Sequence, residues 1–230
     1  MSIYYQHGGV TIYHGDCRDI LPTLAAPASI VTDPPYGIAW SRATWEDDPA
    51  QYGEMMRWLS AEATRLGHWA FVFQSMLNCG HFHEWFPPGW RLFAACKNFA
   101  QIRLGVWRSW DPVVFWYAGE DKEPRPVGYV GRDYHVGNVA GVFGDGNDHP
   151  CPRPTDTMRH IVALTTGAPG GVIDPFMGSG TTLVAAKSLG VQAVGIEMNE
   201  KYCEMAARRL DQECLALPAR VAVETPPLLP

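Results

Sequence analysis

A glycine-rich turn between a short apolar strand and a helix is the feature that most constrains how this chain can fold. The segment 171–187 reads GVIDPFMGSGTTLVAAK, with a strand expected from Gly171 to Asp174 and a helix over 181–189. Glycines let the backbone approach a ligand without a Cβ in the way, and the helix after the turn presents free N–H groups there. This order of elements predicts an α/β protein that binds a cofactor at the carboxyl end of a strand.

The next strand along the chain indicates the kind of cofactor. It is expected over 192–196 and ends at Glu197, 17 positions after Gly180. A carboxylate in that place can accept hydrogen bonds from both hydroxyls of a ribose. Leu183 stands where a pyrophosphate-binding fingerprint has its third glycine, and no Gly-Lys-Ser/Thr comes after the turn to form a P-loop. The pattern therefore favours adenosine over a pyrophosphate, and the alternative is a tight turn with a surface glutamate beyond it.

A second loop carries a different chemistry. The apolar run 28–32 stops at Asp33-Pro34-Pro35-Tyr36, where two prolines exclude both a strand ladder and a helix. The Asp33 carboxylate and the Pro34 carbonyl can accept the two hydrogens of a planar exocyclic amine, which leaves the nitrogen lone pair free, while Tyr36 stacks on the ring. The sequence therefore predicts an amine-binding catalytic loop, and the alternative is an ordinary proline loop.

Both halves of the chain alternate between short strands and helices. Further strands are expected over 10–13, 68–74, 90–96 and 112–117, and helical segments over 17–24, 51–66, 77–86, 155–166 and 199–213. Thr155 and Asn199 are the expected N-caps of the last two helices. Between the halves, the segment 119–148 is rich in Gly, Pro and Asp and too long for an ordinary connection, so we expect an inserted recognition segment.

Composition places the chain among globular proteins and narrows its partners. Its 230 residues (25.5 kDa) are 47% hydrophobic and 18% charged, which suffices for a single domain with a full core. With a formal net charge of -6, the chain as a whole does not attract a polyanion, so a nucleic-acid site needs a local basic patch. The six cysteines contain no Cys-x-x-Cys pair, which predicts reduced thiols and no metal site.

The two ends of the chain bear on its location. The amino terminus lacks the basic-then-apolar layout of a signal peptide, and no apolar run reaches the ~20 residues that span a bilayer. We therefore expect a cytoplasmic protein that is not bound to a membrane. Residues 218–230, which end in Thr-Pro-Pro-Leu-Leu-Pro, are expected to form a flexible tail.

The proline loop and the glycine-rich turn together resemble the DNA amino-methyltransferases, S-adenosylmethionine-dependent enzymes that methylate exocyclic nitrogens of adenine or cytosine. The catalytic loop comes first in the sequence, as in the permuted β arrangement of that family, and the resemblance covers nearly the whole chain. It implies an α/β fold with a doubly wound, mostly parallel Rossmann-like methyltransferase sheet that is circularly permuted and carries a short recognition insertion. A single domain over 1–217 would then contain a catalytic half (1–118), the insertion (119–148) and a cofactor-binding half (149–217).

The resemblance can be traced motif by motif. His14-Gly15-Asp16-Cys17 resembles motif III, Asp33 to Tyr36 motif IV and Asp174 to Thr182 motif I, with Glu197 in motif II. His149-Pro150-Cys151-Pro152-Arg153-Pro154 resembles the His-Pro-x-x-Lys-Pro of motif X, with Arg153 in place of the usual lysine, and Lys97-Asn98 and 107–117 fall in the region of motif VIII.

These matches imply roles for individual residues. Asp16 would lie near the adenine of the cofactor, Glu197 at the ribose, Asp174 with 176–180 around the methionine and sugar, and motif X at the methionine end. The implied catalytic residues are Asp33, Pro34, Pro35 and Tyr36. The implied cofactor-binding residues are Asp16, Cys17, Asp33, His149, Arg153, Asp174, Pro175, Phe176, Gly178, Ser179, Gly180, Thr181, Thr182 and Glu197.

The reaction implied is direct attack of the target amine on the sulfonium methyl, without a metal or a covalent intermediate. The target base would be flipped out of the duplex and stacked on Tyr36, with Trp40, Trp45 and Phe99 as candidate second faces. Aspartate at the first position of motif IV is the commoner form in adenine-N6 enzymes, so adenine-N6 is favoured and cytosine-N4 is the alternative. A nucleotide-dependent oxidoreductase and a catalytically inactive DNA-binding module are more distant alternatives.

Double-stranded DNA is the implied partner, and its phosphates need cations. Basic residues in suitable segments are Arg42, Arg103, Arg108, Lys122, Arg125 and Arg132, of which the candidate DNA contacts are Arg42, Arg108, Arg125 and Arg132. A recognition segment of about thirty residues presents only a few side chains to base edges, which predicts a recognition site of roughly three to five base pairs. A segment this short also favours a homodimer.

Overall fold

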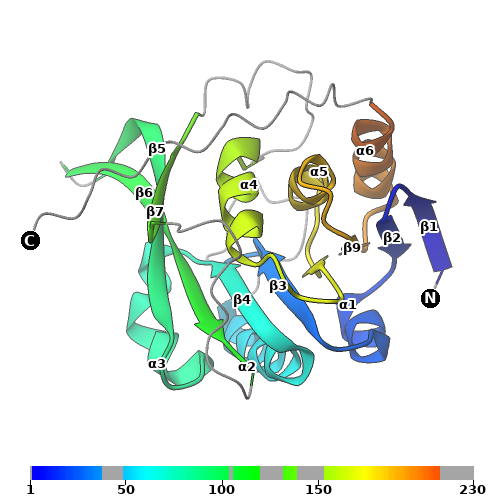
Figure 1. Cartoon of the computed structure of the whole chain (residues 1–230). Coiled ribbons are helices and arrows are strands. Elements are labelled where there is room, and N and C mark those ends of the chain that lie inside the picture. The colour runs from blue at the N-terminus through cyan, green and yellow to red at the C-terminus, as the bar shows by residue number, and fades with distance from the viewer. Residues whose placement is uncertain (1, 38–48, 104–105, 120–131, 139–152, 213–230) are drawn as a thin grey trace, which may run out of the picture.

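The computed structural model describes residues 2–37, 49–103, 106–119, 132–138 and 153–212 (Figure 1). These residues form one mixed sheet with the strand order β1-β2-β9-β8-β3-β4-β6-β5-β7. The strands are β1 (Ser2–His7), β2 (Val10–His14), β3 (Ala28–Thr32), β4 (Gly67–Phe73), β5 (Arg91–Arg103), β6 (Val106–Tyr117), β7 (Tyr134–Gly137), β8 (Val172–Asp174) and β9 (Ala193–Glu197). The helices are α1 (Cys17–Ile20), α2 (Pro49–Leu66), α3 (Phe82–Trp85), α4 (Thr155–Leu164), α5 (Thr181–Ser188) and α6 (Glu200–Asp211), and the 3-10 segments are η1 (Leu21–Thr23) and η2 (Met76–His81).

The centre of the sheet is parallel, as the sequence predicts. Strands β2, β9, β8, β3 and β4 run in the same direction, and antiparallel pairs lie toward the two ends, at β1 and around β6. At the junction of β3 and β8, Ser29 lies opposite Val172 and Ile30 opposite Ile173. The chain leaves β3 through α2 toward β4 on one side and leaves β8 through α5 toward β9 on the other. This reversal is the switch point at which doubly wound sheets bind ligands.

Helices cover both faces of the sheet. α4, α5 and α6 pack on one face, and α1, α2 and α3 pack on the other (Figure 1). Phe71 and Phe73 of β4 belong to the first of these two cores, whereas Ala70 and Val72 belong to the second. Successive side chains of a strand point to opposite faces, so a strand covered on both sides is apolar throughout. This explains the unbroken apolar run of β4.

Local sequence signals predict some boundaries well and others poorly. The strand expected over 28–32 is confirmed as β3, and Asn199 caps α6 by accepting a hydrogen bond from the Lys201 N–H at 3.0 Å. The helical segment expected over 77–86 is present, but most of it is the 3-10 segment η2, which contains Gly80, and only one α-helical turn, α3, follows. Thr155 is wrong as an N-cap: Pro154 occupies that position, and Thr155 is the first helical residue.

Two strands have no counterpart among the expected elements. β1 pairs antiparallel with β2, and β7 lies inside the segment 119–148 and pairs parallel with β5. Both are edge strands with exposed side chains, so neither shows the apolar pattern that reveals an inner strand. β5 and β6 also extend beyond the expected runs 90–96 and 112–117. None of the helices in the described ranges combines the length and apolar character needed to cross a membrane.

Candidate active site

Four acidic residues gather at one edge of the sheet. Asp16 and Asp33 come after β2 and β3, and Asp174 and Glu197 are the last residues of β8 and β9. These four strands are parallel neighbours, so their carboxyl ends lie at the same edge. The order of strands thus brings together acids that are far apart in the sequence, at the place where a doubly wound fold binds its ligand.

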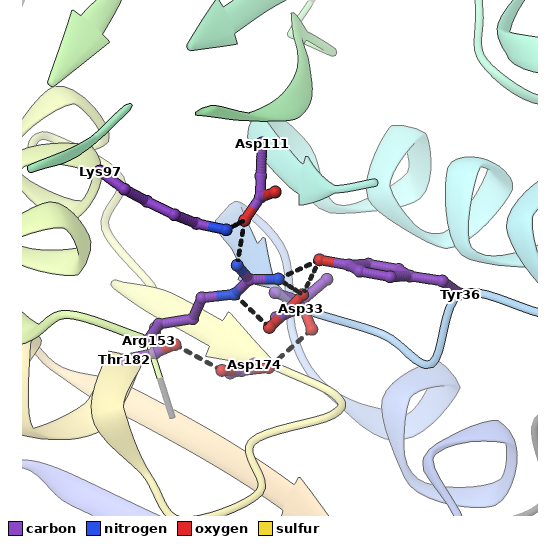
Figure 2. A network of polar contacts seen from close by, with 8 residues as sticks. Asp33, Tyr36, Lys97, Asp111, Arg153, Asp174 and Thr182 are labelled. Atoms are coloured by element: carbon purple, nitrogen blue, oxygen red, sulfur yellow. Dashed lines mark hydrogen bonds and ion pairs between the residues drawn. The ribbon is translucent and has the colours of Figure 1, made fainter. Parts of the chain in front are cut away.

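Asp174 lies beneath the glycine-rich loop and is only 3% exposed. Its Oδ1 accepts hydrogen bonds from Thr32 Oγ1 at 2.6 Å and from the Phe176 N–H at 3.1 Å, and its Oδ2 accepts from Thr182 Oγ1 at 2.5 Å. Burial raises the pKa of Asp174 to about 6, although these hydrogen bonds oppose the shift. The carboxylate thus joins the end of β3 to the first turn of α5 and sets the shape of the loop (Figure 2).

Glu197 holds the same loop from the neighbouring strand. Its Oε2 accepts a hydrogen bond from the Gly178 N–H at 3.0 Å, and its Oε1 accepts from the Asn199 N–H at 2.8 Å. Burial raises the pKa of Glu197, although the backbone N–H groups oppose that shift. A carboxylate offers about four acceptor sites, so these bonds fix its direction and leave acceptor capacity for a ligand.

Close packing against α6 explains why the loop needs a glycine. Gly180 has a φ of +80°, and a Cβ at this residue would lie 2.7 Å from the Cβ of Ala206. From α6, Arg209 Nη1 donates to the Ser179 carbonyl oxygen at 2.6 Å and to the hydroxyls of Ser179 and Thr181 at 3.2 Å. Arg209 is absent from the predicted site because a lone arginine on a helix has the same local sequence signal as a solvated charge.

Asp16 caps the short helix α1 at the far side of this edge. Its Oδ1 accepts a hydrogen bond from the Arg18 N–H at 2.8 Å, and its Oδ2 pairs with the Arg18 guanidinium at 2.7 Å. The hydrogen bonds from Arg18 lower the pKa of Asp16, although burial opposes the shift. Burial raises the pKa of the adjacent Cys17 to about 12, which keeps that thiol protonated near neutral pH.

The predicted catalytic loop, residues 33–36, is held against η2 and α2. Tyr36 donates its hydroxyl hydrogen to Asp33 Oδ1 at 2.6 Å, and Asn78 Nδ2 donates to the Tyr36 carbonyl oxygen at 2.9 Å. Gly37 has a φ of +61°, and a Cβ there would lie 2.4 Å from the Cβ of Tyr52. Burial raises the pKa of Tyr36 well above its usual value, although the nearby Arg153 opposes the shift. Tyr36 is therefore a neutral donor to the Asp33 carboxylate.

An arginine is shared between Asp33 and a second aspartate, Asp111 (Figure 2). Arg153 donates from Nε to Asp33 Oδ2 at 2.6 Å and from Nη2 to Asp33 Oδ1 at 3.0 Å. Its Nη1 donates to Asp111 Oδ2 at 2.6 Å, its Nη2 also bonds the Tyr36 hydroxyl, and Lys97 Nζ lies 2.8 Å from the same Asp111 oxygen. Burial lowers the pKa of Arg153, but its anionic partners outweigh burial and raise that pKa well above its usual value.

The motifs do not by themselves imply this contact between Arg153 and Asp33. The resemblance assigns Arg153 to the methionine end of the cofactor site, which stays a prediction, and the structure shows its guanidinium bonded to the Asp33 carboxylate. Asp111 is absent from the predicted site residues, although it lies within the segment 107–117. The signal that could reveal it is an aspartate directly before the apolar run 112–117, because a buried charge in a strand needs a partner.

The remaining predicted residues divide into two groups. Pro34 and Pro35 lie in the catalytic loop, and Pro175, Phe176, Gly178, Ser179 and Thr181 lie in the glycine-rich loop or at the start of α5. Trp40, Arg42, Trp45, Lys122, Arg125 and His149 are outside the described residues, as are the side chains of Phe99, Arg103 and Arg108 on β5 and β6. Arg132 is exposed beside the edge strand β7, where its Nη1 donates to the Tyr134 hydroxyl at 2.7 Å.

Known proteins share this arrangement of loops and strands. A family model described as a DNA methylase, N6_N4_Mtase, matches residues 100–208, just under half of the chain. The chain is similar to this DNA methylase family over those residues. Among family relatives, YubD of Escherichia coli (strain K12) is 28% identical over 214 residues, which are 85% of this chain and 88% of YubD. The resemblance inferred from the motifs is thereby confirmed.

Other relatives are similar to this chain over a shorter stretch. The DNA adenine methyltransferase YhdJ of Escherichia coli (strain K12) is 38% identical over 91 residues, which are 38% of this chain and 31% of YhdJ. The chain spans only about a quarter of the length of several curated relatives that it matches, such as 23% of the type II methyltransferase M.ScaI of Streptomyces caespitosus.

Solved structures confirm the fold of the chain. The crystal structure of the M1.HpyAVI–SAM complex matches with a TM-score of 0.64 and 21% identity, over 88% of this chain and 100% of that chain. The cytosine-N4-specific PvuII DNA methyltransferase matches with a TM-score of 0.67 and 14% identity, over 87% of this chain and 86% of that chain. The expected doubly wound, Rossmann-like methyltransferase sheet is therefore present. Among the described residues, no group of three or more His, Cys, Asp or Glu side chains could hold a metal ion.

Proposed function

We propose that this methylase transfers a methyl group from S-adenosylmethionine to the exocyclic N6 of an adenine flipped out of double-stranded DNA. The observation that carries the proposal is the placement of Asp33 and Tyr36 at the switch point. Thr32, which directly precedes Asp33, hydrogen-bonds Asp174 at the start of the glycine-rich loop at 2.6 Å. An acceptor for an amine thus adjoins a loop suited to a nucleoside cofactor.

The residues around the glycine-rich loop fit S-adenosylmethionine. The Gly178 N–H is held by Glu197, and Gly180 keeps the loop clear of any side chain while it packs on α6. Glu197 is the carboxylate for the ribose hydroxyls, and Asp16 is the acid nearest the start of α1, where the resemblance places an adenine. When bound, S-adenosylmethionine supplies a sulfonium methyl group, which is the electrophile for an amine nitrogen.

The catalytic loop prepares the amine. Asp33 and the Pro34 carbonyl accept the two amine hydrogens, so the nitrogen lone pair is free of competing donors. The ring of Tyr36 supplies a stacking surface for the base, and its hydroxyl remains bonded to Asp33. Neither Asp33 nor Tyr36 forms a covalent bond to the substrate. The loop acts by orientation and by hydrogen bonds that strengthen as positive charge develops on the nitrogen.

The same loop also fits the N4 amine of cytosine, which is the second candidate. Asp33 as the first residue of the catalytic motif supports adenine, and the relative YhdJ is named as a DNA adenine methyltransferase. The structural likeness to the cytosine-N4-specific PvuII enzyme supports cytosine. Both bases present an exocyclic amine with two hydrogens, so the acceptors of the loop serve either one.

A single experiment distinguishes these candidates. The full chain is incubated with S-adenosylmethionine labelled in the methyl group and with unmethylated genomic DNA, and the DNA is digested to nucleosides. We expect the label in N6-methyldeoxyadenosine. Label in N4-methyldeoxycytidine assigns the alternative base, and unlabelled DNA from a protein that binds S-adenosylmethionine rejects methyl transfer to DNA. Glu204→Gln is a control that retains activity, because Glu204 forms an exposed ion pair on α6.

Recognition of the DNA sequence is assigned to the segment 119–148. Its described part contains β7 at the edge of the sheet, with the exposed Arg132 two residues before Tyr134, the first residue of that strand. We expect the site recognised to span roughly three to five base pairs, with a homodimer as the way to add contacts. Size-exclusion chromatography with and without duplex DNA tests the dimer, because one monomer on one duplex contradicts it.

A further inference from the structure

Arg153 is fixed by two strands before it reaches the catalytic loop. Its guanidinium carbon lies 4.8 Å from the centroid of the Phe73 ring at the end of β4, and its Nη1 bonds Asp111 on β6 at 2.6 Å. The side chains of Arg153 and Asp111 are only 11% and 4% exposed. When a planar guanidinium is held at its face and at one nitrogen, its other two nitrogens have little freedom to change position. β4 and β6 therefore set the direction in which Arg153 approaches Asp33.

The contacts of Asp33 differ between its two oxygens. Among the described residues, Oδ1 accepts hydrogen bonds from the Tyr36 hydroxyl at 2.6 Å and from Arg153 Nη2 at 3.0 Å. From the part of the chain that the structure describes, Oδ2 accepts a hydrogen bond only from Arg153 Nε, at 2.6 Å. A carboxylate oxygen has two lone pairs, so Oδ1 is filled and Oδ2 keeps one acceptor position. The network leaves a single direction from which Asp33 can accept an amine hydrogen.

Charges alternate in sign along this network, from Asp33 through Arg153 and Asp111 to Lys97. Lys97 Nζ and Arg153 Nη1 share one oxygen of Asp111, at 2.8 and 2.6 Å. Each charge has a neighbour of opposite sign, which is the condition under which buried charges are tolerated. Removing the charge of Asp111 would leave two cations side by side and release one end of the guanidinium.

We propose that Arg153, anchored by Asp111, is a positioning residue that fills Oδ1 of Asp33 and presents Oδ2 to the amine of the target base. The inference rests on the proposed function and moves Arg153 from the cofactor contact that its motif implies to the catalytic loop. Arg153 acts through Asp33, and Asp111 acts through Arg153. Loss of either residue therefore impairs the transfer step and leaves binding of S-adenosylmethionine in place.

The test compares Arg153→Gln, Arg153→Lys and Asp111→Asn with the wild type. We expect Arg153→Gln to lower kcat by roughly 10- to 100-fold, the effect of losing charged hydrogen bonds, and to change the Kd for S-adenosylmethionine by less than about 2-fold. Arg153→Lys keeps the charge without the two-pronged contact, so its kcat lies between those of Arg153→Gln and the wild type. Arg208→Gln is the matched control, because Arg208 is exposed on α6 and its loss leaves both constants unchanged.

Asp111→Asn tests whether Asp111 anchors Arg153. We expect a lower kcat with an unchanged Kd, and we expect the double variant with Arg153→Gln to be no slower than Arg153→Gln alone, because Asp111 acts through that arginine. If the reductions in kcat of the two single variants multiply in the double variant, Asp111 does not act through Arg153 and its anchoring role is rejected. Thermal melting of each variant checks that it is folded, and Arg153→Lys carries the test if Arg153→Gln is not.

Two results separate this inference from the proposed function. An Arg153→Gln protein with a tenfold weaker Kd for S-adenosylmethionine and an unchanged kcat at saturation makes Arg153 a cofactor contact and overturns the inference, while methyl transfer stands. A wild-type protein that methylates no DNA rejects the proposed function by itself. In that case the Kd of Arg153→Gln for S-adenosylmethionine still tests the role of Arg153, because a tenfold loss of affinity in this variant assigns Arg153 to the cofactor site.

Discussion

Asp174 gives the stability of the protein a dependence on pH that is opposite to that of most carboxylates. Its side chain is enclosed at the end of β8, and burial raises its pKa from 3.8 to about 6. The difference of about two pKa units corresponds to roughly 3 kcal/mol at 1.36 kcal/mol per unit, which is the cost of ionising this carboxyl in the folded protein. We predict that Asp174→Asn removes this cost.

Whether stability rises or falls with pH depends on whether the folded or the unfolded state loses the Asp174 proton at the lower pH. Below pH 3.8 the carboxyl is protonated in both states, so its stabilising contribution to the folded state is fully present. Between pH 3.8 and about 6 only the unfolded chain ionises, and the folded state loses stability as the pH rises. Above about 6 both states are ionised and the loss is complete. We expect about 2 kcal/mol of this loss of stability to occur between roughly pH 4.5 and pH 6.5.

The assay is urea unfolding of the wild type and of Asp174→Asn across that range of pH. The difference between their free energies of unfolding isolates Asp174, because every other titrating group is present in both proteins. The asparagine oxygen can still accept from Thr32 and Phe176, and its amide can donate to the Thr182 hydroxyl after that hydroxyl turns. We expect the wild type to lose about 2 kcal/mol relative to the variant as the pH rises. A constant difference, or one that changes in the other direction, refutes the reasoning.

Three further predictions concern the site. Asp33→Ala should reduce methyl transfer by at least ~100-fold while S-adenosylmethionine binds nearly as before, because the lost acceptor acts on the amine in the transition state; near-normal turnover removes Asp33 from the mechanism. Glu197→Ala should weaken S-adenosylmethionine by roughly 1.5 to 3 kcal/mol through lost hydrogen bonds to the ribose, and an unchanged dissociation constant in calorimetry rejects that assignment. Replacing 119–148 by a flexible linker should preserve cofactor affinity and abolish site-specific methylation; an unchanged methylated sequence would move recognition elsewhere, with 38–48 as the next candidate.

Features decided within a few residues are predictable from the sequence. The apolar run 28–32 with two prolines just after it predicts β3 and the start of the catalytic loop, because proline cannot continue the ladder. Glycines between a strand and a helix predict the loop after β8 in the same way. The edge strand β7 is not predictable, because its hydrogen bonds come from β5 and its side chains need no apolar pattern.

The sequence by itself predicted the two loops, the chemistry proposed for them and the resemblance to the DNA amino-methyltransferases. It also determined that Asp16, Asp33, Asp174 and Glu197 lie at strand ends, because apolar runs and turn residues are local signals. Only the tertiary structure decided that these strands are neighbours, and that Arg153 and Asp111 lie on Asp33, from which Arg153 is 120 positions away in the chain. Contacts of this kind depend on the order of strands in the sheet. That order is set by packing both faces under helices, a property of the whole chain that no single segment encodes.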